Sequence, residues 1–182
     1  MFKKEFLSHL LVGIGWLVVI TLLRWSWHLD LAWFWAGGLI GTFLFNLDHL
    51  LYLLVINPHE LTSQRVQRLL AQKKIKETLI LMAQTTHERH YLSFHSAFFQ
   101  VILLVLCFFV LTSTNHLFGS GLVMGMMLHL LKDEVEEWLT GQEERLKKWL
   151  FWQVKFDVSF EQQRLFIILM VLFFVVLNLF LV

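Results

Sequence analysis

The sequence has little of what shapes loop-rich or thiol-based proteins: one proline, one cysteine and nine glycines among 182 residues. A single cysteine cannot form a disulfide within the chain, and a structural thiolate zinc site needs several. Cys107 lies inside an apolar run, where it is expected to act as a packing residue. Because residues that promote turns are scarce, the chain is expected to form long helices.

Apolar residues are abundant. They make up 57% of the chain, and the mean hydropathy is +0.64. A soluble domain of this size has no use for so much apolar surface, and several runs approach the ~20 residues that cross a bilayer. An open sheet is excluded because its edge groups would stay unpaired in lipid. The sequence therefore predicts an all-α, polytopic membrane protein that forms a single membrane domain over residues 1–182.

Five transmembrane helices are predicted, at about residues 6–23, 31–56, 94–112, 117–131 and 165–182. The first follows Lys3 and Lys4 as in a signal peptide, but its apolar part is too long and no cleavage site follows, so we expect a retained span. The last contains no ionisable residue and is expected to be an anchor or packing helix.

Glycine pairs lie four residues apart on two of these spans, at Gly37 and Gly41 and at Gly121 and Gly125. Such pairs let helix backbones approach closely. Glycine is also common in membrane helices without a contact role. The sequence leaves both explanations open.

Basic residues gather at the N-terminus and in the connections 59–93 and 132–164, whereas the other two connections hold only Arg24. The positive-inside rule then predicts that the N-terminus lies in the cytoplasm and the C-terminus outside. The net charge of +1 carries no information about partners, and no nucleic-acid partner is evident.

The two basic connections are expected to be amphipathic. Apolar residues recur at helical spacing within 59–93, which predicts a basic helix over about 64–76 on the cytoplasmic leaflet. Trp149 and Trp152 stand near lysines in 132–164, as is typical of an interfacial belt. The alternative in both connections is a helix that packs on the protein rather than on lipid.

Seven ionisable residues fall near the predicted cytoplasmic ends of the spans. They are His9, Asp48, His49, His90, His95, His129 and Asp133. His129 and Asp133 are four residues apart and therefore share one helix face. Asp48 needs a cation or a basic side chain, because its span contains neither Lys nor Arg.

Neutral imidazoles and carboxylates at one depth predict one or two divalent ions, with zinc as the first choice and manganese or iron as alternatives. Each residue also has a structural alternative: His9 as an interface residue, and His129 with Asp133 as a hydrogen-bonded pair that joins helices. Glu134 and Glu137 are expected to lie on a solvated acidic face.

Four segments resemble a family of inner-membrane, metal-dependent hydrolases that includes a LexA-regulated bacterial member. The family has an early His in a THxxxG-like context, then GxLLPDxDH, HRGxTHS and GxxxHxxxD. In this chain, the corresponding segments are SHLLVG with His9, GTFLFNLDH with Asp48 and His49, HYLSFHS with His90 and His95, and GMMLHLLKD with His129 and Asp133. The resemblance covers residues 1 to about 135.

Four positions depart from the family pattern. Phe45 stands where the family has proline, Asn46 replaces its first aspartate, and Tyr91 with Leu92 replaces Arg-Gly, although Arg89 is adjacent. The missing carboxylate bears on the number of ions and on catalytic competence.

The resemblance implies hydrolysis, and the His-x-x-x-Asp pattern is also similar to that of zinc-dependent phospholipase C, which extends the expectation to phosphoesters. A divalent ion lowers the pKa of water that it binds to about 7. Asp48 or Asp133 is expected to orient the attacking water as general base. We therefore expect a membrane-embedded hydrolase that acts at the cytoplasmic interface on a phospholipid or lipid-linked substrate, with membrane lipid as its partner.

Two other functions compete with hydrolysis. A non-catalytic metal-binding scaffold or transporter is favoured by the aspartate missing at Asn46. A membrane di-iron oxidase also collects histidines on the cytoplasmic side, but it uses HxxxH and HxxHH boxes, and the only close pair here is His87 and His90. The oxidase therefore ranks below the scaffold.

Overall fold

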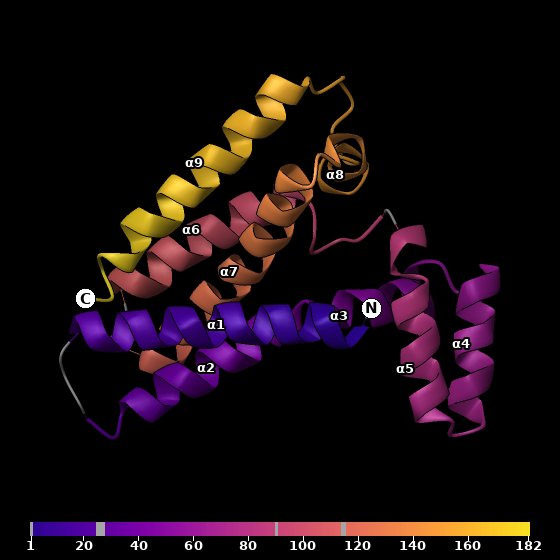
Figure 1. Ribbon diagram of the computed structural model, residues 1–182, viewed down its shortest axis with the longest axis horizontal. Coiled ribbons are helices and arrows are strands. Elements are labelled where there is room, and N and C mark those ends of the chain that lie inside the picture. The colour runs from indigo at the N-terminus through magenta and orange to yellow at the C-terminus, as the bar shows by residue number, and fades with distance from the viewer. Residues whose placement is uncertain (1, 25–27, 90, 114–115) are drawn as a thin grey trace.

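A computed structural model of the chain describes residues 2–24, 28–89, 91–113 and 116–182. These residues form helices joined by turns and short irregular segments, with no strand among them, which confirms the all-α prediction for this part of the chain (Figure 1). In chain order the elements are α1 (Phe2–Arg24), α2 (Leu31–Leu44), α3 (Asn46–Leu51), η1 (Tyr52–Ile56), α4 (Leu61–Ala71), α5 (Ile75–Gln84), η2 (Thr86–Glu88), α6 (Ala97–Ser113), α7 (Leu117–Leu139), α8 (Glu143–Leu150) and α9 (Phe160–Asn178).

Three segments of the described chain are long and apolar enough to cross a membrane. They are Phe6–Arg24, Leu31–Ile56 and Phe160–Asn178, which correspond to the first, second and fifth predicted spans. The third predicted span is the apolar but shorter helix α6, of 17 residues. The fourth lies in α7, which has 23 residues and becomes charged after Leu131. Many large apolar side chains of α1, α6 and α9 face outward, so these helices are compatible with membrane insertion.

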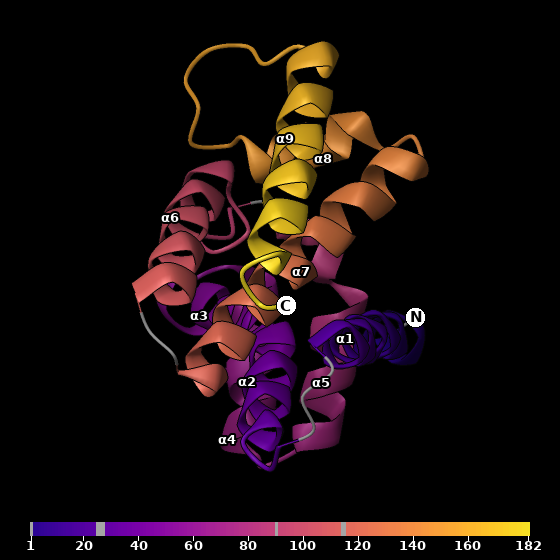
Figure 2. The ribbon, with the colours of Figure 1, turned by 90° about the vertical axis from the view of Figure 1, so that its left-hand side faces the viewer.

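Glycines bring α2 and α7 into backbone contact where the two helices cross (Figures 1 and 2). A Cβ atom added at Gly37 or Gly41 would overlap a carbonyl oxygen of α7. One added at Gly121 or Gly125 would overlap a carbonyl oxygen of α2. Both glycine pairs are therefore contact residues, which decides between the two explanations that the sequence left open.

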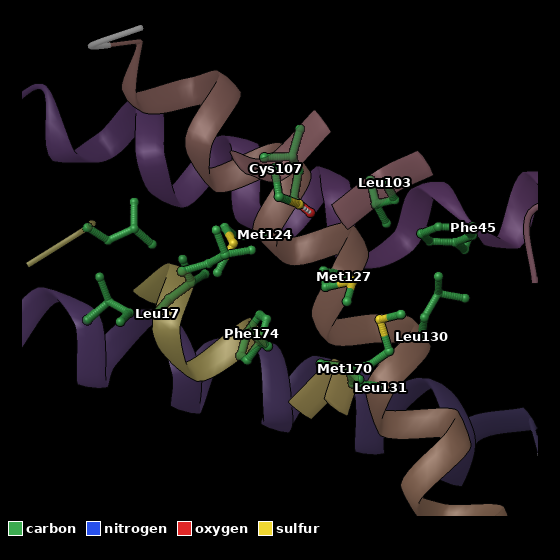
Figure 3. Close-up of a cluster of buried hydrophobic side chains, with 14 of the residues drawn as sticks. Leu17, Phe45, Leu103, Cys107, Met124, Met127, Leu130, Leu131, Met170 and Phe174 are labelled. Atoms are coloured by element: carbon green, nitrogen blue, oxygen red, sulfur yellow. Dashed lines mark hydrogen bonds between the residues drawn. The ribbon is translucent and has the colours of Figure 1, made fainter. Parts of the chain in front are cut away.

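The largest apolar core lies where side chains of α1, α2, α6, α7 and α9 meet (Figure 3). Met124 and Met127 of α7 have no exposed surface. Phe45, at the break between α2 and α3, is also buried and stacks on the His129 ring with centroids 5.5 Å apart. The apolar core therefore extends as far as the polar side chain of His129, and Phe45 lies between this core and the His129 ring.

The basic connection 59–93 differs from the single helix predicted over 64–76. It forms two helices, α4 and α5, joined by a turn in which Lys73 has a φ of 57°. Val66 and Met82 of this hairpin are buried in a cluster with Tyr52 and Leu53 of η1. Val66 and Met82 thus pack on the protein, whereas Leu79 and Ile80 are exposed.

The second connection also contacts the protein. Trp152 is half-buried, and its Nε1–H donates to the carbonyl oxygen of Leu92 at 3.0 Å. Its ring meets that of Tyr91 edge to face at 5.6 Å. Trp152 therefore holds the segment that precedes α6 in place.

Candidate metal centre

Five of the seven predicted site residues line one cavity of about 310 Å³. They are His9, His49, His95, His129 and Asp133. Asp48 lies beside this cavity in contact with His95, and His90 lies outside the described residues. The lining residues come from the first turns of α1, from α3, from the segment before α6 and from the later part of α7. The predicted topology brings these helix ends to one side of the membrane, and the cavity brings their side chains together.

Three of these side chains form a compact group. One ligand atom from each of His9, His129 and Asp133 lies within 4.8 Å of the others. Oδ1 of Asp133 is 2.8 Å from Nε2 of His9, and Oδ2 is 3.3 Å from Nε2 of His129. The two imidazole rings stack with their centroids 4.2 Å apart. At 2.8 Å the two atoms are within hydrogen-bond distance, so the contact between His9 and Asp133 does not by itself require an ion.

The donor set of this group fits a divalent transition metal. Two imidazole nitrogens and one carboxylate are a ligand set of catalytic zinc sites, which keep a further position open. Imidazole and carboxylate also suit manganese and iron. His9 and His129 are both buried. The alternative of a polar pair that joins helices α1 and α7 uses the same contacts, and Lys132 Nζ, 3.3 Å from Asp133 Oδ1, would support it.

Asp48 is held by backbone amides and by the ring of His95. Its carboxylate is fully buried and accepts hydrogen bonds from the backbone N–H groups of Ser93, Phe94 and His95 at 3.3, 2.8 and 3.3 Å. Oδ2 also lies 3.1 Å from Nδ1 of His95. Backbone amides and the His95 ring thus surround the carboxylate, an arrangement that composition alone does not reveal. Asp48 thereby fixes the turn before α6 and the orientation of the His95 ring.

Replacing Asp48 by alanine is expected to lower the free energy of unfolding by about 3 kcal/mol, because several buried N–H groups would lose their acceptor. Thermal unfolding in detergent measures the effect. Asp157→Ala is the matched control, since Asp157 is exposed and forms its ion pair with Lys147. Equal stability of the two variants would show that the carboxylate does not hold this turn.

Arg89 connects His49 to the C-terminal end of α5 through hydrogen bonds. Its guanidinium is buried, and Nε–H donates to Nδ1 of His49 at 3.2 Å. One terminal nitrogen donates to the carbonyl oxygen of Met82 at 2.6 Å. Sequence reasoning noted Arg89 only as a neighbour of the missing Arg-Gly pair and did not predict this contact.

Comparisons with protein-family models, curated proteins and solved structures found no match. The resemblance to the hydrolase family stays a prediction, and the interpretation of the site depends on its own geometry.

Glu134 does not lie on a solvated acidic face, and that expectation was wrong. Its side chain is fully buried, it interacts with the buried Gln100 of α6, and burial raises the pKa of its carboxyl to about 8. The signal was present in the sequence, because Glu134 follows the buried Leu130 by four residues and therefore shares its helix face. Glu137 forms an ion pair with Arg145 at 3.3 Å.

Proposed function

We propose that this protein is a membrane-embedded hydrolase that depends on a divalent ion held by His9, His129 and Asp133. The convergence of these three side chains at one cavity carries the proposal. Zinc is the first choice for this donor set, with manganese or iron as alternatives. A single ion is proposed, because Asn46 lines the same cavity at the position where the resembled family has its first aspartate.

His95 is the proposed general base. Asp48 lies against Nδ1 of His95 and, as a carboxylate, accepts the Nδ1 proton, which leaves the Nε2 lone pair available to take a proton from water in the cavity. Asp48 then orients the base and does not act as one, while Asp133 is committed to the ion. When bound, the ion supplies Lewis acidity and lets water attack at neutral pH.

The proposed substrate is a phosphoester that carries an apolar chain, such as a phospholipid or a lipid-linked phosphate. The cavity combines its polar residues with an apolar wall that includes Phe43 and Met82. Phe6 and Leu79 belong to the same wall and are 45% and 46% exposed. This apolar lining therefore continues to the outer surface, where an acyl chain would enter.

The proposed topology has five spans, with the N-terminus and the site on the cytoplasmic side of a prokaryotic inner membrane. Two observations support it. The site residues lie at those helix ends that five alternating spans would bring together, and the adjacent hairpin of α4 and α5 carries exposed Arg65, Arg68 and Lys76. Basic residues next to a span favour the cytoplasmic side.

Hydrolysis of p-nitrophenyl phosphate and of a short-chain phosphatidic acid by the detergent-purified protein tests the proposal. We expect hydrolysis that is lost on chelation with EDTA, returns with added zinc, and favours the lipid over the soluble ester. A reaction that continues unchanged in EDTA would contradict a metal-dependent mechanism.

A metal-binding scaffold or transporter is the second candidate, favoured by Asn46 at the cavity. Stoichiometric zinc binding without turnover of any phosphoester would establish this candidate instead. Optical and Mössbauer signals of coupled iron would establish the di-iron oxidase.

A further inference from the structure

We infer that His49 is a hydrogen-bond donor to an oxyanion in the cavity, and not a metal ligand, and that Arg89 holds it in the tautomer this role requires. The inference deepens the proposed function, because the oxyanion would be a phosphoryl oxygen of the substrate. The tautomer itself follows from contacts that do not depend on any activity.

The contact between Arg89 and His49 fixes which ring nitrogen carries the proton. Nε–H of Arg89 lies 3.2 Å from Nδ1 of His49. A guanidinium is a donor only and does not lose its proton in proteins, so Nδ1 must accept. The neutral imidazole then carries its single proton on Nε2.

The fold prevents Arg89 from turning away. Its side chain is 4% exposed. One terminal nitrogen donates to the carbonyl oxygen of Met82 at 2.6 Å and to Oγ1 of Thr86 at 3.1 Å, and the other donates to Oγ1 of Thr85 at 3.2 Å. These acceptors lie at the C-terminal end of α5, where backbone carbonyls have no further partner within the helix. Arg89 is therefore a fixed donor toward His49.

His49 consequently differs from the other cavity histidines. A metal ligand must offer a lone pair, and the one lone pair of neutral His49 is occupied by Arg89. His49 lines the cavity, with its ring centroid 5.5 Å from that of His95, and the bond from Arg89 is its only ring hydrogen bond within the described chain. Its Nε2–H is therefore available to an oxygen bound in the cavity.

A donor held in place before the substrate binds stabilises negative charge that develops on oxygen. Loss of one such donor typically lowers kcat about 10²–10³-fold. Arg89 is a positioning residue, because it acts on the substrate only through His49.

Nitrogen NMR of ¹⁵N-histidine-labelled protein in detergent tests the tautomer, with His49→Gln to assign the signal. We expect His49 to show protonated Nε2 and unprotonated Nδ1, both without metal and after one equivalent of zinc chloride. Arg89→Met should give a mixture of the two tautomers, and Arg89→Lys, which keeps a donor, should restore part of the wild-type state. A zinc-induced change of Nε2 to a metal-bound signal, or a proton on Nδ1, would overturn the inference.

Zinc titration provides a second test that needs no NMR assignment. His49→Ala is expected to keep the zinc stoichiometry of the wild type, whereas His129→Ala loses it. Loss of zinc in a His49→Ala protein that still unfolds cooperatively would make His49 a ligand and refute the inference. These readouts are independent of turnover, so failure to hydrolyse any phosphoester would affect the proposed function and leave the tautomer standing.

Discussion

Replacing His129 or Asp133 by alanine is expected to abolish both stoichiometric zinc binding and phosphoester hydrolysis. Among the described residues, three side chains converge on the proposed ion, and each change removes one of them. Loss of a residue that merely orients a ligand lowers metal affinity about 10–100-fold, and loss of a ligand from a three-residue site should cost more. Elemental analysis, zinc titration and turnover of the purified variants measure these effects.

The matched controls are His59→Ala and Asp30→Ala, which remove the same chemical groups from exposed positions. Both are expected to retain wild-type zinc content and turnover. The comparison then separates the loss of an imidazole or carboxylate anywhere in the protein from its loss at the proposed metal site. Wild-type activity in either His129→Ala or Asp133→Ala would refute the proposed function.

Gly41→Ala is expected to destabilise the protein by about 3 kcal/mol, at the upper end of the usual range for overpacking. The added Cβ would overlap the carbonyl oxygen of Leu122, and a backbone atom cannot move to another rotamer. The helices would have to separate, which would shift α7 and with it His129. The temperature of thermal unfolding in detergent and the affinity for zinc should therefore both decrease.

Gly15→Ala is the control for this prediction. Gly15 also lies within a helix, α1, but nothing stands within 4 Å of the Cβ it would gain. Replacing a glycine inside a helix by alanine then stabilises by roughly 0.5–1 kcal/mol. Equal unfolding temperatures for Gly41→Ala and Gly15→Ala would contradict the close crossing of α2 and α7.

The gathering of the site residues could be predicted because it depends on hydropathy and on helix direction. His9 comes early in an apolar run and His129 late in another, so alternating spans bring them to one side. The spacing of His129 and Asp133 adds a shared helix face. Both features are properties of a single segment, and the structure indeed places these side chains in contact.

The hydrogen-bond partners within the site could not be predicted in this way. Asp48 is held by backbone N–H groups of a turn 45 to 47 residues further along the chain. Arg89 meets His49 across 40 residues. These hydrogen bonds depend on how a turn and a helix end are placed in three dimensions. The break of the basic helix near Lys73 was also missed, because a lysine with positive φ gives no local signal.

X-ray absorption at the zinc edge tests the central claim most directly. The protein is loaded with one equivalent of zinc, and the spectrum of the wild type is compared with those of His129→Ala and His59→Ala. We predict nitrogen and oxygen neighbours at about 2.0–2.1 Å with the multiple scattering typical of imidazole and no sulfur, lost in His129→Ala and kept in His59→Ala. An identical zinc environment in all three proteins would show that the ion does not bind at His9, His129 and Asp133.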